Sequence, residues 1–267
     1  DFENEEIILP ASNQIFYSSI NGNVTTPYKA SSFGDAMIIS NVYENGQGII
    51  TFDKNLTTIE SYAFSNCNTL TKILLPNSVN KIENGAFGGC SALISINIPK
   101  NVKKIGNNAF SSCVCLTSIN IPEGVIEIGD DNCYGYGYDY GFSFSNCKNL
   151  KSITIPEGTE TIGGFSGSGL ESIVIPNSVT SIGAGSAFKD CVNLKSVTLP
   201  KNKNFTAIRN KTFYNCTSLV ECVVPGSVTL MEEEVFKNCT SLTNVAMGDY
   251  VTRIGEYAFS SCRLLTS

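Results

Sequence analysis

Residues 86–99, AFGGCSALISINIP, contain the two motifs that decide the fold of this 267-residue chain. In the second motif, Ile96 and Ile98 alternate with polar residues, which is the period-two pattern of a short strand with one buried face. Pro99 ends that strand because proline cannot donate a hydrogen bond to a sheet. We therefore expect the isoleucines to point inward and the polar residues between them to face solvent.

Both motifs recur along the chain at a spacing close to 23 residues. The first appears as AFSNC at 63, AFGGC at 86, AFSSC at 109, FSNC at 144, AFKDC at 187, TFYNC at 212, VFKNC at 235 and AFSSC at 258. The second appears as LTKILLP at 70, LISINIP at 93, LTSINIP at 116, LKSITIP at 150, LESIVIP at 170, LKSVTLP at 194 and LVECVVP at 219. Self-similarity at such a period is the signature of a repeat protein.

A unit of this length cannot bury its own apolar face, so neighbouring units must stack, each strand pairing in parallel with the one before it. The sequence predicts a right-handed, mainly β solenoid: a parallel concave sheet of short strands, with short strands and helical turns on the return side. We expect about nine strand positions, the first in GIITFD at 48. Two units are irregular. GFSGSGLES at 164 is expected to lack both the Phe-to-Cys spacing and the cysteine, and eleven residues are inserted near 130–141.

Residues 1–46 do not repeat and are expected to form a β cap, with the repeats occupying 47–267 and an incomplete last unit that begins at Leu265. Asn21-Gly22 and Asn45-Gly46 lie between apolar runs, and such pairs are strong signals for two-residue hairpins because both positions accept positive φ. The cap therefore should contain two hairpins, and a ligand-binding head is an alternative for the same residues.

The composition excludes several classes of function. A net charge of −6 gives no basic surface for nucleic acid, and no apolar run is long enough to span a membrane. The chain has no histidine, which is the usual general base and the commonest metal ligand. We expect no enzyme, no cofactor and no metal site, although a glycosidase would need only two carboxylates.

The units, with L-x-x-I-x-I-P followed by V-x-x-I-G and A-F-x-x-C, resemble the BspA-like leucine-rich repeat proteins over about residues 47–267. The preceding segment also resembles the lead-in of such proteins from gut Bacteroides. The resemblance implies a secreted or bacterial cell-surface protein that takes part in adhesion to host proteins or other cells, without catalysis. It transfers no ligand residues.

Eight of the eleven cysteines occupy one repeat position. Equivalent residues on stacked coils lie about 4.8 Å apart with parallel Cα–Cβ bonds, whereas a disulfide needs its Cβ atoms about 3.8 Å apart. The sequence therefore predicts a column of buried free thiols, with Cys222 in the core at an inward strand position. Cys115 and Cys133 are the only candidates for a bridge.

Two surfaces are candidates for binding a partner. The outward strand positions carry small hydroxyl groups, which form either an extended docking surface or merely side chains compatible with a flat sheet: Ser95, Ser118, Ser152, Ser172 and Ser196. The insertion, GDDNCYGYGYDYGF at 129, combines glycine with exposed aromatic groups, a composition shared with antibody paratopes: Tyr134, Tyr136, Tyr138 and Tyr140. The insertion can equally be a neutral one, and its aspartates allow a calcium site as a third possibility.

We therefore expect a non-catalytic surface protein whose solenoid binds host or bacterial proteins. One alternative is a carbohydrate-binding module that stacks sugars on the tyrosines of the insertion. The other is a structural spacer, if the native chain continues beyond Ser267.

Overall fold

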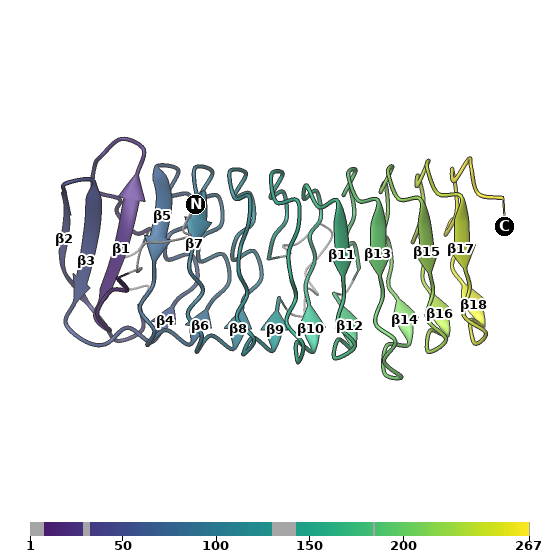
Figure 1. The fold of residues 1–267 in the computed structure, drawn as a ribbon, viewed down its shortest axis with the longest axis horizontal. Coiled ribbons are helices and arrows are strands. Elements are labelled where there is room, and N and C mark those ends of the chain that lie inside the picture. The colour runs from purple at the N-terminus through teal and green to yellow at the C-terminus, as the bar shows by residue number, and fades with distance from the viewer. Residues whose placement is uncertain (1–7, 29–32, 130–142, 184, 267) are drawn as a thin grey trace.

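The computed structural model describes residues 8–28, 33–129, 143–183 and 185–266, and its coils lie side by side in one long row (Figure 1). The predicted solenoid, mainly β with parallel strands, is confirmed. Each coil has three sides: a ladder side that contains the strand after the repeat leucine, a second side with a two-residue strand, and a turn side that contains the Phe-x-x-Cys motif.

The two strand-bearing sides form separate columns of parallel strands. The ladder side contains β5 (Leu70–Leu74), β7 (Ser95–Ile96), β11 (Ser172–Val174), β13 (Ser196–Thr198), β15 (Glu221–Val223) and β17 (Asn244–Ala246). The second side contains β4 (Thr58–Ile59), β6 (Lys81–Ile82), β8 (Lys104–Ile105), β9 (Glu127–Ile128), β10 (Thr161–Ile162), β12 (Ser181–Ile182), β14 (Ala207–Ile208), β16 (Leu230–Met231) and β18 (Arg253–Ile254). The register of the paired strands places equivalent residues of adjacent coils side by side, for example Ile82 of β6 beside Ile105 of β8.

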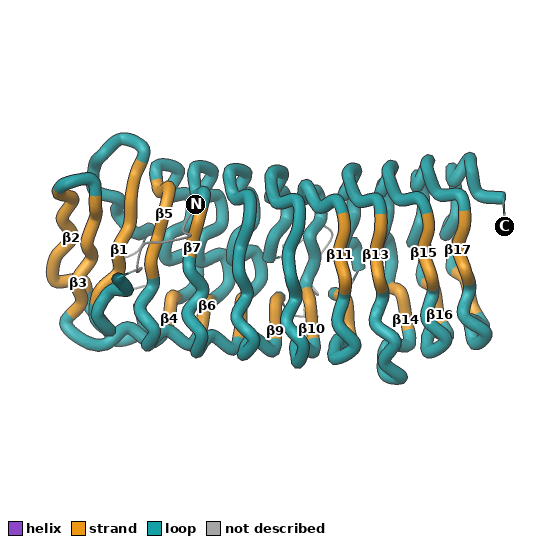
Figure 2. The backbone as a smooth tube through the Cα atoms, viewed as in Figure 1, coloured by secondary structure: helices purple, strands orange, loops and turns teal. Residues whose placement is uncertain are grey.

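The turn side contains no helix in the described residues, so the predicted helical turns are wrong (Figure 2). The reason is that its amides alternate between two kinds of acceptor: some donate within the coil over three residues, as in a tight turn, and those between them donate to the next coil. The N–H of Phe64 donates to the carbonyl of Ala86, and Asn66 donates to Gly88. Residues such as Asn66 and Asn108 also have φ values of 57°. A left-handed residue in every turn stops a right-handed helix from propagating.

A column of stacked phenylalanine rings fills the core beneath the turn side. Successive rings from Phe64 to Phe259 are nearly parallel, with centroids 5.3–5.6 Å apart. The inward strand residues lie beside this column, and Ile73 and Leu75 have no exposed surface, as the alternation predicts. The core is therefore one continuous rod that each coil extends by one layer.

The irregular coil at 164 keeps its place in the column, which corrects one expectation. Phe165 stacks between Phe144 and Phe188, and Ser168 lies three residues after it, so the Phe-to-Cys spacing is retained with serine in place of cysteine. The Ser168 hydroxyl lies 3.4 Å from the Cys191 thiol. The missing residue falls between Ser168 and the next repeat leucine, where the chain passes through Gly169.

The N-terminal sheet also differs from expectation. β2 (Ile38–Glu44) and β3 (Gln47–Phe52) form a hairpin through Asn45-Gly46, but Asn21-Gly22 makes none. Instead, β1 (Gln14–Ser19) lies between β3 and β5 and is antiparallel to both. β3 was expected to be the first strand of the parallel column and is separated from it by β1. The alternation of apolar residues in β1 is compatible with a partner on either edge. The sequence of β1 alone therefore could not predict that it lies between β3 and β5.

Candidate binding surface

The predicted serines all lie along the ladder side. We call the outward side chains of this side, at the second and fourth positions after each repeat leucine, the ladder face. Ser95 is half-buried, and the other four serines are exposed. Ser172 and Ser196 are direct cross-strand neighbours, whereas Ser118 and Ser152 lie in segments that form no strand. The face thus contains the predicted residues, but not as one uninterrupted ladder.

Strand pairing on this side is broken in the middle of the molecule. Segments 117–121 and 151–155 lie between β7 and β11, and neither forms a strand. Within the described residues, the one backbone hydrogen bond from these segments to a neighbouring coil on the ladder side is Glu171 N to Lys151 O. Most backbone groups of these segments therefore have no cross-coil hydrogen bond within the described residues.

A shallow groove of about 460 Å³ lies at this break. The side chains of Ser152 and Ser172, two of the predicted residues, line it together with Thr154 and Val174. Val174 is 66% exposed, so the groove combines hydroxyl groups with an open apolar surface. Ser95, Ser118 and Ser196 lie outside its lining.

The groove also has an acidic rim that we did not anticipate. Glu123 and Glu157 line it, and no lysine or arginine among the described residues does so. Both glutamates directly follow the proline of their unit, in the repeated PEG of two consecutive units. Other units have asparagine, lysine or glycine at this position, for example Asn77 and Lys100. The signal was therefore present in the sequence as two acidic residues at one repeat position.

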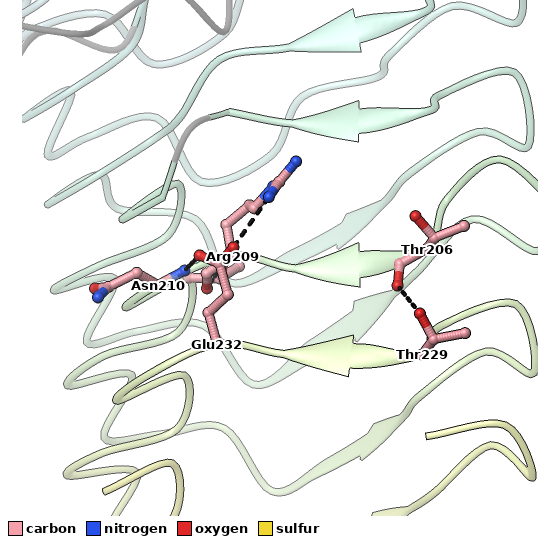
Figure 3. Close-up of polar contacts among 6 residues, drawn as sticks. Thr206, Arg209, Asn210, Thr229 and Glu232 are labelled. Atoms are coloured by element: carbon pink, nitrogen blue, oxygen red, sulfur yellow. Dashed lines mark hydrogen bonds and ion pairs between the residues drawn. The ribbon is translucent and has the colours of Figure 1, made fainter. Parts of the chain in front are cut away.

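A second cluster of polar groups lies on the second side, at β14 and β16 (Figure 3). The Glu232 carboxylate accepts hydrogen bonds from the Arg209 guanidinium at 3.0 Å and from the Asn210 N–H at 2.8 Å. At the other end of these strands, the Thr229 hydroxyl donates to the Thr206 carbonyl at 3.3 Å. These groups join adjacent coils and satisfy one another, so the cluster is structural.

The cysteine column is confirmed, with its inner members fully buried and free: Cys90, Cys113, Cys147, Cys191, Cys216 and Cys239. Each thiol donates to a phenylalanine carbonyl of the preceding coil, as Cys113 does to Phe87 at 3.2 Å. Burial raises the pKa of Cys191 to about 11 and those of Cys147 and Cys222 to about 12, so these thiols stay protonated and unreactive. In the part of the chain that the structure describes, no group of three or more metal-ligating residues occurs.

The other sequence candidate, the tyrosine-rich insertion, lies outside the described residues: Tyr134, Tyr136, Tyr138, Tyr140, its aspartates and Cys133. Cys115 carries a free thiol. The described ranges contain no helix that could cross a bilayer.

Comparison with known proteins identifies relatives of the whole repeat array. The sequence model of the "BspA type Leucine rich repeat region" matches residues 36–137 and 140–266 in six copies. Among solved structures, a leucine rich cell surface protein from Faecalibacterium prausnitzii A2-165 is 29% identical with a TM-score of 0.52, and the match covers 79% of this chain and 56% of that one. This chain thus spans little more than half of that protein.

Two further structures are similar at lower TM-scores. The T. pallidum leucine rich repeat protein is 28% identical, with a TM-score of 0.47 over 72% of this chain and 74% of that one. A leucine-rich repeat protein from Bacteroides ovatus ATCC 8483 is 26% identical, with a TM-score of 0.45 over 85% and 72%. No curated protein matches the chain.

Proposed function

We propose that this chain, which belongs to the BspA-type leucine-rich repeat family, is a non-catalytic, surface-exposed protein that binds other proteins through its ladder face. The family membership and the likeness to a leucine rich cell surface protein support a role in protein interaction and a location at the bacterial surface. The single observation that carries the location of the site is the groove at the break in strand pairing.

The chemistry of the groove favours an extended polypeptide with a basic side chain. Backbone groups of segment 151–155 that lack a cross-coil partner add hydrogen-bonding capacity to the wall of the groove, along which an extended peptide can lie. Val174 offers apolar contact beside the hydroxyl groups of Ser152 and Ser172. Glu123 and Glu157 place negative charge where a lysine or arginine of the peptide would lie, and complementary charge contributes specificity and rate of association.

The experiment is a binding assay on extracellular-matrix proteins, mucins, glycans and surface proteins of other bacteria, performed with the intact chain and three variants. Glu123→Gln combined with Glu157→Gln removes the acidic rim, and Val174→Lys blocks the apolar surface. Glu221→Gln is the matched control, because Glu221 is an exposed carboxylate on the same face outside the groove. We expect the groove variants to weaken binding at least about tenfold, which is roughly 1.4 kcal/mol, and the control to bind like the parent.

A variant with residues 130–141 replaced by a short Gly-Ser link tests the insertion separately. Loss of glycan binding in this variant alone would favour the carbohydrate-binding alternative. If the parent binds nothing in the panel, the adhesion proposal fails and the spacer hypothesis gains. If a partner binds and all four variants bind it equally, the groove is not its site.

A further inference from the structure

The N-terminal sheet ends in an open edge. The strand order is β2, β3, β1, β5, β7, so β2 has a partner on one side, and among the described residues no strand pairs with its other side. Figure 1 shows β2 at the extreme end of the row. An exposed edge of this kind is a template for pairing with another strand, and natural proteins usually blunt it with lysine, proline or a bulge. β2 contains neither lysine nor proline, and its one irregularity is at Ile39.

The hairpin fixes which backbone groups of β2 point away from the sheet. Asn45 and Gly46 have φ values of 51° and 81°, and Glu44 stands opposite Gln47, as in a two-residue hairpin. The residues that close such a turn are hydrogen-bonded to each other, and bonding alternates along an antiparallel strand. Glu44 and Val42 therefore bond to β3. Asn41 and Tyr43 direct their N–H and C=O groups outward.

The side chains of Asn41 and Tyr43 hold the outward-pointing backbone groups of these two residues in place before any partner binds. The Asn41 side chain accepts a hydrogen bond from the Tyr17 hydroxyl at 2.8 Å and donates to the Thr25 carbonyl at 3.0 Å. The Tyr43 hydroxyl donates to the Gly46 carbonyl at 3.0 Å, and its ring lies 5.8 Å from that of Tyr17. Because the strand is already ordered, pairing at this edge has little conformational entropy to lose.

An apolar row crosses the outer face of the same sheet and ends at this edge. Val42 stands opposite Ile49, Ile49 opposite Phe16, and Phe16 opposite Leu74. Residues directly opposite one another point to the same face. This face is the outer one, because the alternate residues, such as Ile15 and Ile50, are fully buried. Val42, at the open end, is 44% exposed, and no further side chain of the described residues continues the row.

We propose that β2 pairs antiparallel with β2 of a second copy of this chain, which joins two solenoids end to end about a two-fold axis at Val42. In this register Asn41 of each copy exchanges backbone hydrogen bonds with Tyr43 of the other, which uses the outward-pointing groups. Val42 faces Val42 of the second copy in a non-hydrogen-bonded pair, where side chains are closest. The two apolar rows then form one row across eight strands.

The charges of β2 are compatible with this pairing and favour a second copy over an unrelated strand. Glu44 is the only charged residue of β2, and it falls opposite Ser40 of the other copy, so no like charges meet. A two-fold pairing uses the same patch on both partners, and this patch is complementary to itself in backbone groups, apolar row and charge. The bulge at Ile39 limits the pairing to residues 40–44, a short contact that predicts a weak, concentration-dependent dimer.

The test uses sedimentation analysis of the whole chain over a range of concentrations, with charge-swap variants at the axis. The parent is expected to show a reversible monomer–dimer equilibrium. Val42→Lys and Val42→Glu each place two like charges opposite each other and should weaken dimerisation at least about tenfold. A mixture of the two variants should form the heterodimer, because the opposite charges then face each other.

Val223→Lys is the control, because Val223 is a comparably exposed strand valine far from this edge, and it should leave the dimer intact. Thermal melting of every variant distinguishes lost pairing from lost folding. A parent that stays monomeric at all concentrations overturns the proposal. A dimer that survives Val42→Lys, or variants that fail to recover when mixed although both are folded, also overturns it, since the contact would then lie elsewhere.

Discussion

Gly169→Ala should destabilise the solenoid for a purely steric reason. Gly169 lies where the short coil has lost a residue, and its N–H donates to the Cys147 carbonyl at 3.1 Å. An added Cβ would stand 2.8 Å from the carbonyl carbon of Lys148 and closer still to its oxygen. Ordinary van der Waals contact begins at about 3.4 Å, so the two coils must separate by more than half an ångström. The φ of Gly169 is not in the left-handed region, so backbone strain plays no part.

The expected cost combines two effects. Overpacking a close contact costs about 1–3 kcal/mol, and weakening the hydrogen bond to Cys147 adds about 1 kcal/mol. We therefore expect a loss of roughly 2–4 kcal/mol, seen in urea titration followed by circular dichroism as a lower midpoint, and in thermal melting as a fall in Tm of about 5–10 °C.

Gly226→Ala is the matched control for this substitution. Gly226 also lacks a left-handed φ, and an added Cβ there meets nothing within 4 Å. Alanine at such a position stabilises by about 0.4–1 kcal/mol, because it restricts the unfolded chain. If the two variants melt alike, the short coil is not drawn tightly against Lys148, and the steric explanation is wrong.

Three further predictions concern the core and the ladder side. Phe144→Ala removes a fully buried ring stacked on both faces and should cost about 3–5 kcal/mol in urea unfolding; a cost below about 1 kcal/mol would contradict the stacked column. The Asn97 side chain accepts a hydrogen bond from the Leu75 N–H at 2.7 Å and donates one to the Leu75 carbonyl at 2.9 Å, so Asn97→Ala should cost about 2 kcal/mol. Asn120→Ala, at the equivalent position but with no such bonds to the described residues, should be nearly neutral by the same titration. Stability should fall as pH rises above about 9. The raised pKa values of buried thiols such as Cys191 and Cys222 keep these thiols protonated in the folded state, whereas the thiols of the unfolded chain ionise. The free energy of unfolding should therefore be lower at pH 10.5 than at pH 8, and equal values would contradict this reasoning.

The sequence predicts the core of this protein well because the core is periodic. Each inward residue of a coil contacts its equivalents in the coils before and after, so a repeat position translates directly into a column. This is why the buried thiols and the inward isoleucines could be predicted from spacing, and why phenylalanines at one repeat position form a stack. Ser168 shows where motif matching fails. Serine occupies the repeat position of the cysteine, and the missing residue lies between Ser168 and the next repeat leucine.

The features that the sequence could not predict depend on backbone bonding between segments. The turn side has helical spacing of apolar residues, but alternate amides bond to the next coil, so isolated turns form instead of helices. β1 carries an alternation that suits any antiparallel strand, and nothing in its residues says that it inserts between β3 and β5. The groove arises from strand pairing that fails in segments 117–121 and 151–155, although their sequences match those of the paired segments.

Several irregular features of the array lie at neighbouring coils, and a solenoid tolerates such features locally. Strand pairing is also interrupted further along, between β12 and β14 and between β13 and β15. The unpaired segments, the acidic rim of Glu123 and Glu157, and the short coil at Gly169 all lie between residues 117 and 176. In a solenoid each coil contacts only its neighbours, so a departure from the repeat costs stability locally and leaves the remaining coils in register. The phenylalanine column continues through this region at unchanged spacing, with Phe110, Phe144 and Phe165 at 5.4 and 5.5 Å. The stacked core therefore holds the coils together while the ladder face above it is free to depart from strand pairing, and a binding groove can form there without breaking the rod.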